Sequence, residues 1–270
     1  VTPEQVTISN KLGWKRVPLL EAEPTFEPGV WKGLSNDAVQ RISYEGILEC
    51  WEQGNELLGM PYTAKLLSVH DPDEYLANAR SDKDRSLRWK DLLGAYTALE
   101  DLKKDGHAEA IGVGAKNWRV IRDLLEHIEL DWVMPADSLT VYDHPMELIR
   151  FVEELRTRGI LVINSAIFNS GFLVGGAYFD YKQVTRRENP RLFTWRDKFY
   201  EVCETFEVAP VDACVEFALA PKGVSAIAMN TSKPGRVEKN VASIRKHAPV
   251  AFWRELLRLE LVSITPEQLR

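Results

Sequence analysis

Short apolar segments rich in β-branched residues alternate with amphipathic segments along almost the whole chain. Apolar runs of this length, bounded by polar residues, are typical of parallel strands that are covered on both faces. The pattern predicts six strands, at residues 6–11, 64–70, 109–114, 131–136, 159–166 and 224–229. A weaker seventh apolar segment lies near Val208. Strands that alternate with helices in this way predict an α/β fold with a parallel sheet.

The amphipathic segments predict the crossover helices. In residues 44–58 apolar side chains recur at helical spacing, and Gly59 and Pro61 end the pattern. Further helices are predicted at 87–104, 118–128, 145–158, 191–206, 211–219 and 249–261, the last packing on the outside. Residues 17–36 follow neither period and predict a long loop. Because no internal repeat interrupts the alternation, one domain is the simplest interpretation.

Composition and charge exclude several classes of protein. With 45% hydrophobic and 27% charged residues, the chain has the composition of an ordinary globular protein. Its net charge of −6 argues against a nucleic-acid partner. Its apolar runs are shorter than the roughly 20 residues that span a bilayer, so we expect no membrane partner. Cys50, Cys203 and Cys214 lack the spacing of a disulfide framework or a zinc site, so we expect no metal and a cytoplasmic location.

Polar residues that could take part in catalysis follow two of the predicted strands. In a parallel α/β fold the ligand lies beyond the carboxyl ends of the strands. Lys11, at the end of the first strand, suits a Schiff-base nucleophile, a cation that lowers the pKa of a neighbouring acid, or a surface ion pair. His70, at the end of the second, suits hydrogen bonding to a carbonyl or proton transfer. Asp71 and Asp73 flank Pro72 and are interpreted as a turn and helix cap.

Two further segments suit an anionic ligand. Thr231, Lys233 and Arg236 follow the last predicted strand and bring a hydroxyl and two cations to the start of a helix, which is either a phosphate site or an everyday cap. Residues 168–173 form a glycine-containing loop after the fifth strand. Neither the Gly-x-Gly-x-x-Gly fingerprint nor a Walker-type phosphate loop is present, so a Rossmann or P-loop site is not supported.

The chain resembles the aldo-keto reductase superfamily, and more narrowly its sugar-oxidising branch, typified by L-fucose and D-threo-aldose 1-dehydrogenases. The resemblance rests on segments in the family's order: Ile8-Ser9-Asn10-Lys11-Leu12-Gly13, Val69-His70-Asp71-Pro72-Asp73, Ala110-Ile111-Gly112-Val113-Gly114, Phe168-Asn169-Ser170-Gly171-Phe172-Leu173, and Thr231 through Asn240. It implies a (β/α)₈ barrel that binds NADP or NAD in an extended form across the carboxyl ends of the strands. It also implies four catalytic groups, Asp, Tyr, Lys and His, of which Lys11 and His70 match two.

The resemblance also implies where the cofactor binds. The pyrophosphate would lie on the loop of Phe168, Asn169, Ser170, Gly171 and Leu173. The adenosine 2′-phosphate would lie near Thr231, Lys233 and Arg236, and the adenine on Asn240. Ser165 falls where many family members stack an aromatic ring on the nicotinamide. Asn230 replaces a basic residue of the family, so the choice between NADP and NAD stays open.

Two departures from the family pattern change the expected fold and site. The family's Asp and Tyr lie upstream of the lysine strand and are absent from this sequence, and six strands fall short of the eight that close such a barrel. We therefore expect residues 1–270 to form a single barrel domain without its first two βα units. The family's Ser-Asn pair, which holds the nicotinamide amide, reads Ala115-Lys116 here.

The expected function is that of an NAD(P)-dependent enzyme that oxidises C1 of a free aldose to its lactone, or reduces a carbonyl, by direct hydride transfer. Its partner would be a small aldose or aldehyde, and an oligomer is left open. Trp14, Trp31 and Tyr142 are candidates for a platform on which a sugar stacks. One alternative is a regulatory protein that binds the cofactor with little turnover. Another is a Schiff-base aldolase that uses Lys11.

Overall fold

The computed structural model describes residues 2–26, 33–231 and 233–269. It divides into two compact units, Val1–Met134 and Pro135–Arg270, which are described here one by one. The expectation that residues 1–270 form a single barrel domain stays a prediction.

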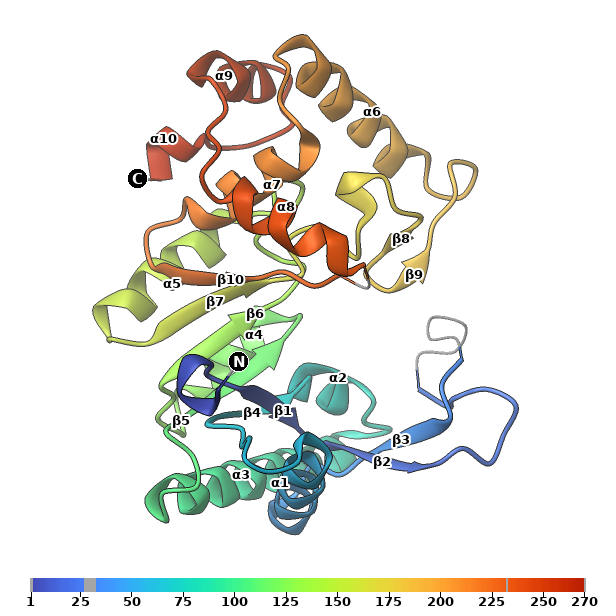
Figure 1. Ribbon diagram of the computed structural model, residues 1–270, viewed down its shortest axis with the longest axis vertical. Coiled ribbons are helices and arrows are strands. Elements are labelled where there is room, and N and C mark those ends of the chain that lie inside the picture. Colours follow the sequence, from blue (N-terminus) through green and yellow to red (C-terminus); the bar gives the residue numbers. More distant parts are fainter. Residues whose placement is uncertain (1, 27–32, 232, 270) are drawn as a thin grey trace. The chain divides into compact units, whose positions relative to one another are not determined.

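The first unit is an α/β layer structure whose chain order follows the predicted alternation. Its strands are β1 (Ser9–Leu12), β2 (Trp14–Pro18), β3 (Asn36–Gln40), β4 (Leu66–His70), β5 (Ala110–Ala115) and β6 (Trp132–Pro135), the last residue of β6 opening the second unit. Its helices are η1 (Pro3–Gln5), α1 (Tyr44–Leu58), α2 (Pro72–Ala77), α3 (Asp82–Lys104) and α4 (Trp118–Leu124). Helices α1 and α3 pack against each other beside the sheet (Figure 1).

The sheet of the first unit has the strand order β1-β4-β5-β6. Strand β1 pairs in parallel with β4, and β4 in parallel with β5. The middle strands are buried along most of their length, as their continuous apolar sequence predicts. Strand β1 is at the edge and exposes Ser9, so the expectation that every strand is covered on both faces is wrong there.

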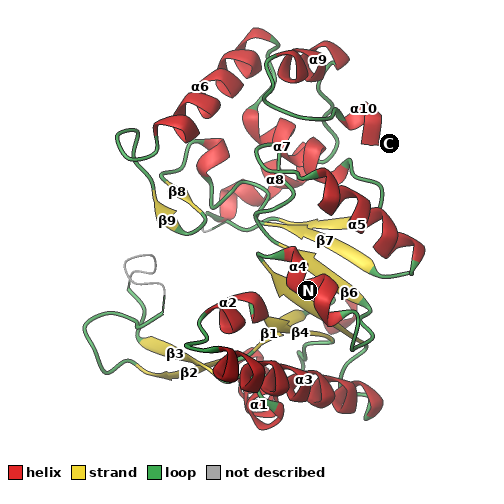
Figure 2. Cartoon of the chain, turned by 180° about the vertical axis from the view of Figure 1, so that it is seen from behind, coloured by secondary structure: helices red, strands yellow, loops and turns green. Residues whose placement is uncertain are grey.

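An antiparallel hairpin flanks the segment that the sequence predicted as a long loop, and its strands include only Val17, Pro18 and Asn36 of that segment. Residues of β2 and β3 pair from Trp14 opposite Gln40 to Pro18 opposite Asn36, and the hairpin projects from the rest of the unit in both views (Figures 1 and 2). The Glu49 carboxylate of α1 binds the ammonium of Lys15 on β2 at 2.8 Å. Hairpin pairing is therefore supported by a neighbouring helix, which local periodicity does not reveal.

The second unit contains the remaining predicted elements. Its strands are β7 (Leu161–Ser165), β8 (Tyr178–Phe179), β9 (Lys182–Gln183) and β10 (Val224–Ala228). Its helices are α5 (Met146–Thr157), η2 (Phe172–Val174), α6 (Pro190–Thr205), α7 (Pro210–Leu219), η3 (Pro234–Arg236), α8 (Val237–Ser243), α9 (Val250–Arg258) and α10 (Pro266–Leu269). Strands β7 and β10 pair in parallel, with Ala228 beside Ser165. Two positions of β10 are exposed, and Val208 lies in no strand.

The core of the second unit is aromatic. Phe199 of α6, Phe217 of α7, and Phe252 and Trp253 of α9 are almost completely buried in one cluster. Helix α9 was expected on the outside, but its apolar face closes this core. Rings of this size bury a large apolar area, and edge-to-face pairs such as Phe252 and Trp253, with ring centroids 4.9 Å apart, add to it.

The three cysteines are free and buried. Burial raises the pKa of Cys50, raises that of Cys203 to about 12, and raises that of Cys214 well above its usual range. In the described ranges, no helix combines the length and the apolar character that crossing a bilayer requires.

Two glycines of the first unit differ in the space around them, and the same substitution should have opposite effects. A Cβ on Gly112 of β5 would lie 2.4–2.5 Å from the ring and carbonyl oxygen of Trp132, so Gly112→Ala should destabilise the fold by about 1–3 kcal/mol. Gly94 of α3 has ordinary contacts, the nearest at 3.6 Å, so Gly94→Ala should stabilise the fold by about 0.5–1 kcal/mol. Urea unfolding of both variants measures the difference, and a stable Gly112→Ala would contradict the packing described for β5 and β6.

Candidate functional site

Lys11 and His70 come together at the carboxyl ends of neighbouring strands. Lys11 of β1 is paired in register with Ser68 of β4, and His70 ends β4 opposite Gly114 of β5. A Cβ on Gly114 would lie only 2.9 Å from Cδ of Lys11 and 3.9 Å from its Nζ. The lysine side chain therefore crosses the end of β4 and occupies the space that a side chain at Gly114 would fill. Both predicted catalytic residues face the same small region of the first unit.

Asp71 joins this pair. Its backbone N–H donates to the Gly114 carbonyl (2.9 Å), and its φ of 47° places it in the left-handed region. Helix α2 begins directly after it, as predicted, but the Asp71 side chain makes no capping hydrogen bond. Its Oδ2 instead lies 3.3 Å from Nε2 of His70. The Asp73 carboxylate, in the first turn of α2, accepts the backbone N–H of Asn117 (2.7 Å) in addition to its interaction with backbone N–H groups of its own turn.

Burial sets the charge of these groups. It lowers the pKa of His70 to about 3, and the positive charges of Lys11 and Lys116 act in the same direction. Burial also raises the pKa of Asp71 to about 7, against the pull of Lys11 and with the help of Glu74. The imidazole is therefore neutral near neutral pH, and its contact with Asp71 is not an ion pair. Lys116 is bound by Glu74 at 2.7 Å.

Ser165 begins the predicted cofactor segment in the second unit. It ends β7, is buried, and donates its hydroxyl hydrogen to the Pro135 carbonyl (3.1 Å). Because Ala228 of β10 lies beside it, the loops that follow β7 and β10 leave from neighbouring strand ends. The two predicted cofactor segments, 168–173 and 231–240, thus start side by side.

The loop after β7 is held in an uncommon backbone conformation. Asn169, Ser170 and Gly171 all have positive φ, at 45°, 56° and 89°. For residues other than glycine this costs roughly 1–2 kcal/mol each, so the surroundings must enforce it. Asn169 Nδ2 donates to the Asp137 carbonyl (3.2 Å), and Ser170 Oγ accepts the N–H of Tyr181 (2.9 Å).

Helix α6 supports the next residues of this loop. The Arg196 guanidinium donates to the carbonyls of Phe172 (3.2 Å) and Gly176 (3.0 Å), and it lies 4.1 Å from the centre of the Phe172 ring. The Tyr200 hydroxyl donates to the Leu173 carbonyl (3.2 Å). Phe172 and Leu173 are fully buried, while Phe168 is half-buried. The sequence analysis did not single out Arg196, since an arginine in a polar helix carries no motif.

The segment after β10 is open and cationic. Thr231 Oγ1 accepts the backbone N–H of Lys233 (3.1 Å), which forms a turn. Lys233 and Arg236 are exposed, and neither forms an ion pair with a carboxylate in the part of the chain that the structure describes. Asn240 is half-buried on α8. Ser232 lies outside the described residues.

These residues fit a nicotinamide dinucleotide. Oδ1 of the buried Asn169 accepts no hydrogen bond within the described ranges, and an acceptor of this kind suits the hydroxyl or carboxamide donors of such a cofactor rather than its phosphate oxygens. The cations of Lys233 and Arg236 suit a phosphate. Ala115 is buried and apolar, and Lys116 binds Glu74, so the hydrogen bonds of the family's Ser-Asn pair have no counterpart at these two positions.

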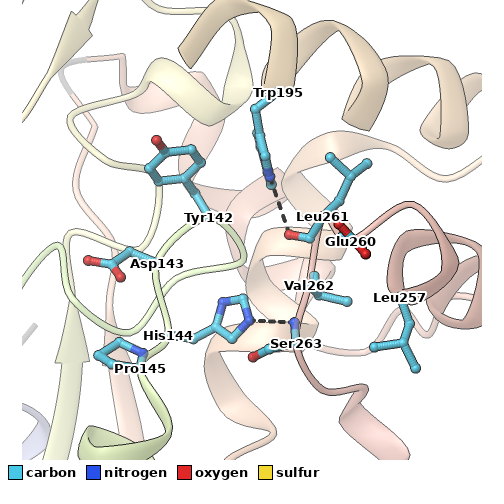
Figure 3. Close-up of a pocket in the computed structure, with 10 residues that line it drawn as sticks. All are labelled: Tyr142, Asp143, His144, Pro145, Trp195, Leu257, Glu260, Leu261, Val262 and Ser263. Carbon is cyan, nitrogen blue, oxygen red and sulfur yellow. Dashed lines mark hydrogen bonds between the residues drawn. The ribbon is translucent and has the colours of Figure 1, made fainter. Parts of the chain in front are cut away.

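A cavity of about 690 Å³ lies elsewhere in the second unit, between the loop after β6 and the chain near Ser263 (Figure 3). At its wall, His144 Nε2 accepts the backbone N–H of Ser263 (2.9 Å), while Nδ1 donates to the Thr140 carbonyl (3.1 Å). Trp195 donates to the Leu261 carbonyl (3.2 Å). Both nitrogens of His144 are therefore engaged, and the ring serves to fasten the C-terminal segment.

Of the aromatic residues predicted as a sugar platform, Trp14 lies in the first unit and Tyr142 in the second. Trp14 lies on β2 with its ring centroid 5.9 Å from that of Phe26. Tyr142 lines the cavity just described and contacts Phe179 and Trp195. Trp31 lies outside the described residues.

The raised pKa of Asp71 makes a prediction about stability. Folding favours its protonated form, so the stability that Asp71 contributes is present at low pH and is lost as the pH rises through about 7. Asp71→Asn should therefore stabilise the protein by about 1–3 kcal/mol at about pH 8, and the gain should shrink toward about pH 4.

Urea unfolding at several pH values measures this effect. Asp84→Asn is the control, because hydrogen bonding from the backbone of Arg80 lowers the pKa of Asp84, and its loss should destabilise the protein at about pH 8. A destabilising effect of Asp71→Asn at that pH would contradict the burial of its charge.

Comparison with known proteins places this chain in one family. The sequence model of the Aldo/keto reductase family matches residues 1–256. Pyridoxal 4-dehydrogenase of Microbacterium luteolum is 26% identical over 275 residues, covering 97% of this chain and 78% of that protein. D-threo-aldose 1-dehydrogenase of Pseudomonas sp is 24% identical over 225 residues, covering 81% of this chain and 63%, less than two thirds, of that protein.

Solved structures show the same fold. Glycerol dehydrogenase AKR11B4 of Gluconobacter oxydans aligns with a TM-score of 0.65 at 18% identity, covering 98% of this chain and 76% of that one. The holo form of aldo-keto reductase AKR11C1 of Bacillus halodurans aligns with a TM-score of 0.64 at 17% identity, covering 96% and 74%. The predicted α/β fold of aldo-keto reductase type is thereby confirmed, and the chain belongs to the aldo/keto reductase family of NAD(P)-dependent oxidoreductases.

Proposed function

We propose that this protein interconverts a sugar hydroxyl and a carbonyl, as an aldose 1-dehydrogenase does, with NAD(P) as the hydride carrier. The observation that carries the proposal is the placement of Lys11 and His70 at adjacent strand ends, with Gly114 leaving room for the lysine. The similarity to an enzyme named for aldoses supports the substrate class. The bound nicotinamide would accept or supply the hydride.

The chain's own groups suit the oxygen of the reacting carbon. An alcohol that loses hydride must also lose its hydroxyl proton, which the family's tyrosine, absent from residues 1–270, would accept as the general base. Negative charge grows on the oxygen as the proton leaves. The Lys11 ammonium stabilises that charge. The neutral His70 imidazole can donate one hydrogen bond to the same oxygen without carrying a charge of its own.

The second unit supplies the proposed cofactor contacts. Asn169, Ser170 and Gly171 would hold the pyrophosphate on their rigid turn. Lys233 and Arg236 would bind a 2′-phosphate, because no carboxylate among the described residues competes for these two cations. We therefore propose NADP rather than NAD as the preferred cofactor.

Removing Lys11 or His70 should slow turnover strongly without preventing cofactor binding. Lys11→Met and His70→Gln should each lower kcat for aldose oxidation by about 10²–10⁴-fold, since each removes a group acting on the reacting oxygen. Formation of reduced nicotinamide measures turnover, and quenching of tryptophan fluorescence measures cofactor affinity. Lys15→Met is the matched control, because Lys15 forms an ion pair with Glu49 of α1, has no part in the proposed chemistry and should leave kcat unchanged.

The alternative functions give other results in the same assays. A wild-type protein that binds the cofactor but converts no aldose or aldehyde would contradict the proposal and support a regulatory role. Trapping of a carbonyl compound on Lys11 by borohydride would instead support an aldolase.

Arg236 should distinguish the two cofactors. Arg236→Ala should weaken NADPH binding by about 10-fold or more and change NADH binding by less than about 2-fold, since only NADPH carries the 2′-phosphate. Arg245→Ala removes another exposed arginine, two residues beyond α8, and serves as the control. Equal losses for both cofactors would contradict the assignment of Arg236 to the 2′-phosphate.

A further inference from the structure

One acidic group touches the proposed reaction centre without a part in the proposed chemistry. The Asp71 carboxylate lies 3.3 Å from Nε2 of His70, the atom that would contact the substrate oxygen. Its side chain is mostly buried, with 17% exposed. A buried carboxylate beside a catalytic imidazole is costly, and no hydrogen bond in the described part of the chain compensates for it.

The backbone directs Asp71 toward His70. The hydrogen bond from its N–H to Gly114 and its left-handed conformation fix the residue between β4 and α2. At the start of a helix an aspartate normally accepts an N–H of the first turn, yet this one does not. The side chain is thus turned from the helix to the end of the sheet, where Lys11 lies.

The surrounding charges determine which substrate hydroxyl can donate a hydrogen bond to the carboxylate. Lys11 attracts the Asp71 charge, while Glu74 and Asp73 oppose it, and Lys116 adds a weaker attraction. The reacting oxygen becomes negative during oxidation, so a carboxylate would repel it. A second hydroxyl, which keeps its proton, can donate that proton to the carboxylate in a strong hydrogen bond.

We propose that Asp71 is a specificity-determining residue that binds the hydroxyl on the carbon next to the reacting carbon, so that His70 and Asp71 together recognise a vicinal diol. This inference rests on the function proposed above. The imidazole Nε2 contacts the reacting oxygen, and the carboxylate contacts its neighbour. Simple aldehydes and 2-deoxy sugars lack the second hydroxyl and leave the Asp71 oxygens without this hydrogen bond, which gives the protein its preference for polyhydroxylated substrates.

Paired sugars test the inference. The substrates are D-glucose, D-galactose and D-ribose, each compared with its 2-deoxy analogue in aldose oxidation by the full chain. For wild type, kcat/KM should favour the parent sugar by about 10–100-fold, as expected for one hydrogen bond to a charged group. Asp71→Gly removes the carboxylate and suits the left-handed backbone, so it should reduce this preference to less than about 3-fold.

Asp71→Asn is the control for a purely structural effect, because asparagine tolerates the same backbone conformation and keeps the shape of the side chain. It should reduce the preference for the parent sugar to an intermediate value. If Asp71→Gly and Asp71→Asn both retain the full preference, the inference is wrong while the proposed function stands. Equal losses on parent and 2-deoxy sugars would also overturn it. If wild type oxidises none of the six sugars, the proposed function and this inference fail together.

Discussion

The space left by the missing side chain of Gly114 is the constraint on which the first unit's site depends. The Lys11 chain fills that space, with Cδ 2.9 Å from where a Cβ would lie. The parallel registers of β1, β4 and β5 bring the lysine, His70 and this glycine together at the carboxyl ends of the strands. The Gly114 carbonyl also accepts the N–H of Asp71 and fixes the first residue beyond β4. Gly114, which has no side chain, thus determines where the polar side chains at the carboxyl ends of these strands lie.

Strained backbone recurs in the segments that we assign to ligands. Asp71 in the first unit and Asn169 and Ser170 in the second adopt positive φ, which residues with a side chain seldom do. Such conformations persist only where other contacts enforce them. In the second unit those contacts come partly from α6, whose Arg196 holds two carbonyls of the loop. Contacts with the neighbouring helices and strands therefore offset the conformational energy of these positive-φ residues.

Much of the fold could be predicted from the sequence because its strands are short apolar runs and its helices have clear periodicity. All six expected strands are present in the described ranges, within a few residues of their predicted ends. The β2–β3 hairpin was missed because its support, the ion pair between Lys15 and Glu49, joins residues 34 apart. Lys11 and His70 were identified by their strand-end positions. Asp71 was interpreted as a cap because sequence does not reveal where a side chain turns when its backbone is left-handed. Arg196 was missed because its partners are backbone carbonyls, which leave no trace in residue identity.

The burial of the three cysteines has a practical consequence. Thiol reagents attack the thiolate, and the raised pKa of Cys50, Cys203 and Cys214 keeps each of them protonated and shielded. We therefore expect the native chain to react slowly with maleimide dyes. A cysteine placed at an exposed position such as Lys233 would be the one reactive thiol in the protein. Fluorescent or spin labels can then follow a chosen loop without first rebuilding the hydrophobic core.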